Sequence, residues 1–408
     1  MANVLVLNAG SGSQKTALYS IDPDPEGPSV PVWQAAINST TPGQPPEAFL
    51  AQIKSTRGEG QIPIPRDWSL QKKIRALIRA SWEGSFAVLE GSHRIDLIGH
   101  RVVHGGLEFS EAVLVTPRVE ATIDRLGEFA PLHNPVNLEG IRACREALGD
   151  EIPQFAVFDT AFHRTLPQAA TTYAGPYEWV ERGFVRYGFH GTSYRYASRR
   201  ASEIINRQHD EDLCQILCHL GGGCSLAAVR GTRCVDTTMG FTPLDGIAMC
   251  TRSGTIDPGI MLHLLRHGTD VDSLEQILNK QSGLSGLSGL PGDTRVIFPK
   301  ARENDRRAKL AMDVFIHRLR AGIGSMLASL GRLDALVFTD VIGETEPVVR
   351  QRACDAFGFL GLRLDDNLNA SSLPDTDIAT KDSSVRVVVV HGEENWQIAA
   401  ESVEAWHR

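Results

Sequence analysis

The sequence lacks the features that mark secreted, membrane-spanning and zinc-binding proteins. Its 408 residues include seven cysteines, an odd number, with no Cys-X-X-Cys pair and no zinc-ligand spacing to histidine. We therefore expect free thiols in a reducing cytoplasm. The N-terminus has no cationic stretch and its apolar run stops at Leu7, so it does not read as a signal peptide. No apolar run approaches the roughly 18 residues of a membrane span.

Basic blocks are also missing, which excludes nucleic acid as the main partner. The formal net charge is −8, and lysine and arginine are dispersed along the chain. The hydrophobic fraction of 42% is enough for sizeable cores. Because 408 residues exceed one ordinary domain, two or three domains are expected.

Short apolar runs alternate with longer helical patterns, which favours an α/β fold with mixed sheets. Two proline-rich stretches, 22–31 and 41–46, and the Gly/Ser/Leu repeat at 282–292 are expected to be loops. In the helix expected at 305–330, Leu310, Val314, Phe315 and Leu319 fall near one face. The expected strands are 4–7, 95–99, 155–158, 216–218, 335–338 and 385–390, and a further helix is expected at 74–89.

Two glycine-rich hairpins are predicted about 210 residues apart. In the first, Gly10 and Gly12 follow a buried strand, and they correspond to Gly221 and Gly223 in the second. This correspondence predicts a duplicated domain in which each hairpin offers backbone N–H groups to phosphate. The alternative is two unrelated glycine hairpins. No glycine precedes Lys15, so the first hairpin is not a Walker A loop.

Two arginines lie in glycine-rich segments with little apolar periodicity. Arg101 ends a predicted strand, and Arg252 follows the aperiodic stretch 236–246. The fork of a guanidinium suits carboxylate or phosphate, although a structural role is the alternative for each. Such aperiodic segments typically bring backbone close to a ligand.

Several other polar residues directly follow predicted strands or lie between glycines. Asp159 follows a strand, where it could bind Mg²⁺ or cap a helix. His190 stands between glycines, which suggests an exposed ring near backbone. Glu393 and Glu394 follow the last predicted strand, and they could bind Mg²⁺ or form the acidic first turn of a helix.

Taken together, these segments resemble the acetate kinase family, in family order from Asn8 to Glu394. The resemblance implies two duplicated α/β domains of the actin, Hsp70 and sugar-kinase (ribonuclease H-like) type with an interdomain active-site cleft. It implies an N-terminal domain of 1–155 plus 392–408, and a C-terminal domain of 156–391 that carries the donor side. A cytoplasmic homodimer is expected.

The resemblance also implies roles for individual residues. Arg101, Asp159, His190 and Arg252 would be catalytic, and Asn8, Asp159 and Glu393 would hold Mg²⁺ or Mn²⁺. A pocket for the acetate methyl group would consist of Val103, Leu132, Phe189 and Pro243, with Arg101 on the carboxylate and His133 nearby. Phosphate and nucleotide would contact Ser11, Ser13, Lys15, His219, Gly221, Gly223, Asp293, Arg295 and Gly343.

The implied reaction is the reversible, Mg²⁺-dependent transfer of a phosphoryl group between ATP and acetate, giving acetyl phosphate and ADP by direct in-line transfer. Acetate is already ionised at pH 7, so the reaction requires positioning and charge neutralisation rather than a general base. A methyl pocket would discriminate against one extra methylene by only about 1–3 kcal/mol, so propionate is expected to be a poorer substrate.

The departures from the family pattern lie on the donor side. Gly222 stands where the family has asparagine, and Asp340 and Val341 replace two glycines of the ATP-using members. Loss of glycine is costly where φ is positive. One alternative is therefore an enzyme that uses pyrophosphate or phosphate in place of ATP and ADP. Another is a non-catalytic regulator of a partner, against which the retained Arg101 and Arg252 argue.

Overall fold

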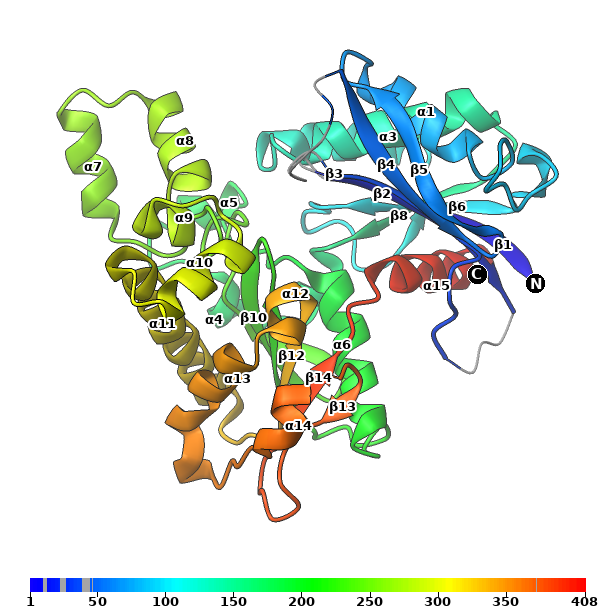
Figure 1. Ribbon diagram of the computed structural model, residues 1–408. Helices are drawn as coiled ribbons and strands as arrows, with labels where there is room; N and C mark the ends of the chain where they lie inside the picture. The colour runs from blue at the N-terminus through cyan, green and yellow to red at the C-terminus, as the bar shows by residue number, and fades with distance from the viewer. Residues whose placement is uncertain (10–12, 23–26, 39–44, 46, 372) are drawn as a thin grey trace. The chain divides into compact units, whose positions relative to one another are not determined.

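The computed structural model describes residues 1–9, 13–22, 27–38, 45, 47–371 and 373–408. The chain forms two compact units: unit 1 is Met1–Phe162 with Glu393–Arg408, and unit 2 is His163–Gly392 (Figure 1). The domain boundaries expected from the sequence, at 155/156 and 391/392, remain a prediction. Within the described residues, no helix is long and apolar enough to cross a membrane.

Unit 1 is built on an eight-stranded mixed sheet with the order β5-β4-β3-β2-β1-β6-β8-β7. Strands β1, β6 and β8 run parallel, whereas β1, β2 and β3 form an antiparallel meander. The strands are β1 (Ala2–Ala9), β2 (Ser13–Ile21), β3 (Trp33–Asn38), β4 (Ala48–Ser55), β5 (Gly58–Pro65), β6 (Leu97–Val102), β7 (Val113–Leu114) and β8 (Gln154–Phe158).

Helices pack on the sheet of unit 1, and the C-terminal helix returns to it. The buried apolar residues of α1 and α3 join those of β1 in one core. The C-terminal helix α15 lies against β1 and β6 (Figure 1). A β-carbon at Gly99 of β6 would lie 2.5 Å from Ser402 Oγ of α15, so glycine permits this close packing. The helices are α1 (Leu70–Arg79), η1 (Ser92–Arg94), α2 (Pro117–Arg125), η2 (Leu126–Glu128), α3 (Asn134–Leu148) and α15 (Glu394–Trp406), with η3 (Ala161–Thr165) at the unit boundary.

Unit 2 is built on a six-stranded sheet with the order β11-β10-β9-β12-β14-β13. Its strands are β9 (Cys214–Leu220), β10 (Cys224–Arg230), β11 (Arg233–Thr237), β12 (Ala335–Thr339), β13 (Thr376–Asp377) and β14 (Arg386–Val390). All residues of β9 and β12 are buried, as expected for apolar strands covered on both faces. The helices are α4 (Gln168–Thr171), α5 (Glu178–Glu181), α6 (Gly191–Ile204), α7 (Pro258–Arg266), α8 (Val271–Lys280), α9 (Gly283–Ser288), α10 (Thr294–Arg302), α11 (Arg306–Leu330), α12 (Asp340–Thr345), α13 (Pro347–Cys354), η4 (Asp355–Leu360) and α14 (Asp366–Ser371).

The two sheets repeat one topology, which is the duplication that the paired hairpins predicted. Strands β3-β2-β1-β6-β8 of unit 1 have the same order and directions as β11-β10-β9-β12-β14 of unit 2. Since β1, β6 and β8 run parallel, their carboxyl ends meet at one edge of the sheet. Asn8, Arg101 and Asp159 lie at that edge.

Three secondary-structure predictions are wrong in their bounds or type. The strand expected at 95–99 is β6, which begins at Leu97 and ends at Val102. The helix expected at 74–89 is α1, which begins after the capping residue Ser69 and ends at Arg79. The repeat expected to be a loop contains α9, which ends at Ser288 and is capped by Gly289 with φ +73°. The helix expected at 305–330 is confirmed as α11, capped by Asp305, but Leu310 is exposed rather than on the buried face of Phe315 and Leu319. The loops expected at 22–31 and 41–46 lie in part outside the described residues, as do Gly10 and Gly12.

Candidate active site

At the strand edge of unit 1, Arg101 binds Asp159 through two nitrogen atoms. Nε donates to Asp159 Oδ1 at 3.0 Å and Nη2 donates to Oδ2 at 2.6 Å. The Asp159 side chain is 1% exposed and that of Arg101 is 18% exposed. Arg101 Nη1 also donates to Asn8 Oδ1 at 3.3 Å. The three residues that the sequence predicted from three separate strands are thus brought together.

The amide of Asn8 extends this cluster to α15. Its Nδ2 donates to Glu394 Oε2 at 3.3 Å and to Asn395 Oδ1 at 3.4 Å. The carboxylate that this amide contacts therefore belongs to Glu394, while Glu393 forms the N-cap position of α15. Lys15 lies opposite Asn8 in the β1–β2 pairing and is exposed.

Two buried asparagines of α3 fix the backbone beside this cluster, and the sequence reasoning missed both. Asn137 Nδ2 donates to the Ala9 carbonyl at 2.8 Å, and its Oδ1 accepts from the Val103 N–H at 3.1 Å. Asn134 bonds the N–H and the carbonyl of His104, each at 3.0 Å. The available signal was two asparagines three residues apart, which lie on one helix face.

The predicted apolar pocket residues have unequal environments. In unit 1, Val103 is buried, whereas Leu132 is 39% exposed. In unit 2, Phe189 is buried and Pro243 is partly buried. His133, expected nearby, is the N-cap residue of α3.

In unit 2, the predicted residues converge on the glycine hairpin between β9 and β10. A β-carbon at Gly223 would lie 3.3 Å from the His190 ring and 3.4 Å from Arg252 Nη1. The same Arg252 nitrogen donates to the Pro243 carbonyl at 3.2 Å. A guanidinium and an imidazole thus lie against the backbone of one hairpin glycine, an arrangement suited to an anion.

The ring of His190 stacks on that of His219, with ring centroids 4.0 Å apart. His190 precedes α6 with φ +58°, a left-handed conformation. Its Nδ1 lies 2.8 Å from Ser225 Oγ, which in turn bonds the hydroxyl of Tyr194. Both partners are buried and both escaped sequence reasoning, since single serine and tyrosine residues carry no distinguishing pattern.

A buried histidine supports the turn that carries His190. His163 Nε2 donates to the Phe189 carbonyl at 2.9 Å, and Nδ1 lies 3.2 Å from Cys234 Sγ. Burial lowers the pKa of His163 from 6.5 to about 4, so the ring is neutral at pH 7. Gly188, with φ +76°, leaves room for this ring, because a β-carbon there would lie 2.4 Å from it.

Both ring nitrogens of His219 have partners. Nδ1 lies 2.8 Å from Ser193 Oγ, and Nε2 lies 3.1 Å from Asp340 Oδ2. Asp340, one of the two positions where the family pattern has glycine, has φ +63°. Val341 follows within α12, and its φ is not positive.

The remaining predicted nucleotide residues take part in local contacts. Asp293 caps α10 and pairs with Arg295, whose Nη2 donates to Oδ2 at 2.8 Å. The buried Gly343 accepts from the buried Arg350 at 2.8 Å through its carbonyl. Ser11 lies outside the described residues, and Ser13 is described only as the first residue of β2.

The oxygen atoms of the unit 1 cluster fit the preferences of Mg²⁺. Amide and carboxylate oxygens are hard ligands, and Mg²⁺ usually takes only one or two carboxylates from protein, together with phosphates and water. Among the described residues, no group of three His, Cys, Asp or Glu side chains could by itself hold a metal. Asn8 and Asp159 could thus contribute oxygen ligands to a Mg²⁺ site.

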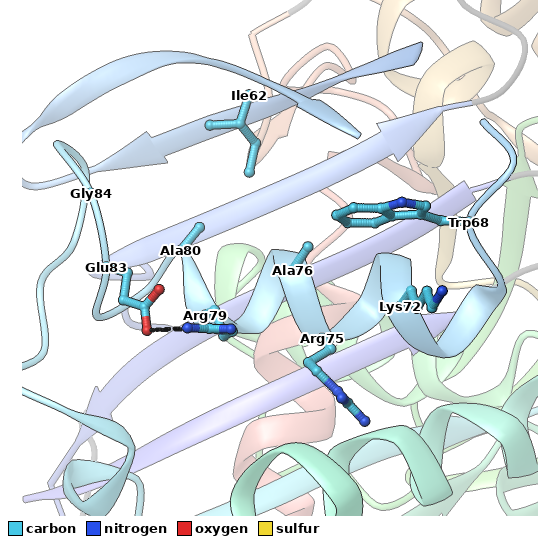
Figure 2. Close-up of a pocket in the computed structure, with 9 residues that line it drawn as sticks. All are labelled: Ile62, Trp68, Lys72, Arg75, Ala76, Arg79, Ala80, Glu83 and Gly84. Atoms are coloured by element: carbon cyan, nitrogen blue, oxygen red, sulfur yellow. Dashed lines mark hydrogen bonds and ion pairs between the residues drawn. The ribbon is translucent and has the colours of Figure 1, made fainter. Parts of the chain in front are cut away.

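A separate surface hollow lies in unit 1 between β5 and α1 (Figure 2). Ile62, Trp68, Lys72 and Arg75 are among its lining residues, and Arg79 pairs there with Glu83. None of the predicted site residues lines it. We assign it no part in the chemistry.

Comparison with known proteins identifies the family. The model of the acetokinase family matches residues 3–400. A protein named acetate kinase from Gloeobacter violaceus is 49% identical over 404 residues, 98% of each chain. Acetate kinase of Porphyromonas gingivalis superposes with a TM-score of 0.89 at 33% identity over 100% of both chains. A propionate kinase of Francisella tularensis gives 0.87 at 37% identity, covering 98% of this chain and 99% of the other. The expected fold class is confirmed, and the chain belongs to the acetokinase family.

Proposed function

We propose that this enzyme catalyses the reversible, Mg²⁺-dependent transfer of a phosphoryl group between ATP and acetate, giving acetyl phosphate and ADP by direct in-line transfer. The observation that carries the proposal is the convergence of His190 and Arg252 on Gly223 of the second hairpin. Membership of the acetokinase family supports it.

The acceptor chemistry requires charge control rather than proton removal. Acetate is already a carboxylate at pH 7, so its oxygen can attack phosphorus without a base. Arg101 would orient the carboxylate, while Arg252 and His190 would donate to the oxygens of the transferring phosphoryl group. Asp159 accepts hydrogen bonds from two nitrogens of Arg101, which fixes the plane of the guanidinium.

Mg²⁺ would be held by Asn8 and Asp159, with Glu393 contributing through the start of α15. When bound, the ion neutralises phosphate charge. The oxygens of Asn8 and Asp159 already accept hydrogen bonds from Arg101. The arginine therefore sets the orientation of both groups.

The acyl chain would be selected by Val103, Leu132, Phe189 and Pro243. These residues are apolar, which suits a methyl group, but one extra methylene changes binding by only about 1–3 kcal/mol. We therefore expect propionate to be phosphorylated with a lower kcat/KM than acetate. A steady-state comparison of the two acids measures this ratio directly.

ATP is the proposed donor, with Ser11, Ser13, Lys15, His219, Gly221, Gly223, Asp293, Arg295 and Gly343 proposed on the phosphate and nucleotide side. The comparisons give no support to the pyrophosphate alternative. The test is to trap acyl phosphate as a hydroxamate from acetate, ATP and Mg²⁺, and to assay ATP formation from acetyl phosphate and ADP. Absence of both products would refute the proposal. Formation of acetyl phosphate with pyrophosphate but not with ATP would show that pyrophosphate is the donor.

We further propose a homodimer in the cytoplasm. Helix α7 has no buried residue, and Ile260, Leu262 and Leu265 are among its exposed apolar side chains. An apolar helix of this kind is typical of a surface covered by another chain. Leu262→Glu should convert a dimer into monomers in sedimentation experiments, whereas Leu107→Glu on unit 1, also exposed, should not.

A further inference from the structure

We propose that Asp340 sets the affinity for the phosphoryl donor by occupying Nε2 of His219. This inference rests on the proposed function, in which His219 contacts donor phosphate. The carboxylate and a phosphate oxygen would compete for the same N–H. Asp340 is therefore a positioning residue that lowers donor affinity through His219.

The contact between these residues bears on which nitrogen of the imidazole carries its hydrogen. Asp340 Oδ2 lies 3.1 Å from His219 Nε2. A carboxylate oxygen at this distance favours the tautomer in which Nε2 carries the hydrogen. Ser193 Oγ lies 2.8 Å from Nδ1 and holds the ring from the other side. Because His219 is 5% exposed and stacks on His190, its ring has little freedom to present another donor.

The backbone places the carboxylate on the phosphate hairpin itself. Thr339 pairs with His219 in the β12–β9 register. The next residue, Asp340, therefore lies beside the point where β9 ends and the hairpin starts. A β-carbon at Gly221 would lie 1.9 Å from Asp340 Oδ2. The carboxylate thus fills the space beside the hairpin backbone that the missing Gly221 side chain leaves.

The conformation of Asp340 keeps it there. Its φ of +63° is one that aspartate and asparagine tolerate better than most residues with a side chain, and that glycine adopts without cost. The Asp340 side chain is 35% exposed, so it can leave Nε2 for solvent when a phosphate replaces it. The competition then lowers donor affinity without blocking the site.

The consequence is a penalty on every donor that presents phosphate to this hairpin. An anion held near the bound phosphates also repels them, and the repulsion adds to the lost hydrogen bond. A charge-assisted hydrogen bond contributes enough to change affinity by about tenfold. The affinity for acetate is not expected to change, because its proposed contacts are Arg101 and the apolar residues of the acyl side.

The experiment measures Mg²⁺–ADP binding by isothermal titration calorimetry, with KM values for ATP and acetate alongside. Asp340→Gly should lower the ADP Kd and the ATP KM by about tenfold, with the acetate KM within twofold of wild type. Asp340→Asn, which keeps an oxygen acceptor without the charge, should give a smaller decrease and serves if the glycine variant is unstable. Asp272→Asn, an exposed aspartate of α8, is the matched control for net charge.

A double-mutant cycle tests whether Asp340 acts through His219. In a His219→Asn background, Asp340→Gly should change the ADP Kd by less than twofold. An unchanged or higher ADP Kd in Asp340→Gly would overturn the inference, as would a tenfold change that persists without His219. Because ADP binding is measured without turnover, these outcomes are distinct from a failure of wild-type protein to make acetyl phosphate.

Discussion

Both carboxylate oxygens of Asp159 accept hydrogen bonds from the guanidinium of Arg101, across the neighbouring strands β6 and β8. The aspartate is almost fully buried and Arg101 is its ionic partner there. A buried charge of this kind is tolerated only while its partner is present. The pair therefore ties the stability of unit 1 to the geometry of the proposed acceptor site.

Arg101→Ala should lower the free energy of unfolding by about 3 kcal/mol, because it leaves the buried charge of Asp159 without its partner. Adding Asp159→Ala should recover part of this loss, so the two effects will not be additive. Chemical denaturation of the four proteins measures the coupling. The surface pair Arg75–Glu146, with a 2.8 Å contact, is the control, and Arg75→Ala should cost under about 1 kcal/mol. Equal losses from both arginine variants would contradict the argument.

Gly221→Ala should destabilise unit 2 by about 1–2 kcal/mol, because the new methyl group displaces Asp340 from His219. In an Asp340→Gly background the same substitution should cost less than half as much. Gly222→Ala should be neutral in thermal unfolding, since a β-carbon there meets nothing within 4 Å. If Gly221→Ala were equally costly with and without Asp340, the carboxylate would not be the obstacle.

The sequence predicted best what depends on pattern along the chain. Buried strands and paired hairpins led to the duplicated α/β topology. Strand ends led to Arg101 and Asp159, and the family resemblance added Asn8. The supporting groups depend instead on contacts across long sequence separations, such as Asn137 with Ala9. The repeat at 282–292 forms a helix despite its glycines, because tertiary contacts override weak local propensity. The partner of Asp340 could not be foreseen, since it follows from the register of β12 on β9.

His190 combines a proposed catalytic role with a left-handed backbone, and substitutions can separate the two. Asparagine tolerates φ +58°, so His190→Asn should keep the melting temperature while lowering kcat by about 100-fold to 1000-fold. His190→Ala should lose the same activity and in addition be about 1 kcal/mol less stable than His190→Gly. Steady-state kinetics and thermal unfolding of the three variants test both parts. Full activity in His190→Asn would show that His190 has no catalytic role.

Acid should destabilise the fold before the carboxylates titrate. Burial lowers the pKa of His100, His104 and His163 from 6.5 to about 4 each. The unfolded chain then binds more protons than the folded one between these values, so stability is full above pH 6.5 and is lost as the pH falls toward 4. Each histidine contributes up to about 1.4 kcal/mol per pH unit. Denaturant unfolding at pH 7.5 and pH 5.5 should show the decrease.

A single substitution checks the origin of this pH dependence. His100→Gln should make the loss between pH 7.5 and 5.5 shallower, because it removes one buried titrating ring. His209→Gln, at an exposed position, should leave the slope unchanged. A slope that is the same in all three proteins would mean that His100 does not remain neutral in the fold.

The seven cysteines should react slowly in the native protein, and Cys250 should be the first to react. All seven are buried and free, and burial raises the pKa of Cys144 to about 12 and that of Cys250 to about 11. Cys250 is the most exposed of them at 8%, and its thiol donates to the Gly221 carbonyl of the phosphate hairpin.

Slow titration with an aromatic disulfide at pH 8 should therefore abolish activity as the first thiol reacts. Cys250→Ala should delay both events, whereas Cys354→Ala, far along the chain and 2% exposed, should delay neither. If activity were lost in step with the reaction of another thiol, the link between Cys250 and the function of the hairpin would be contradicted.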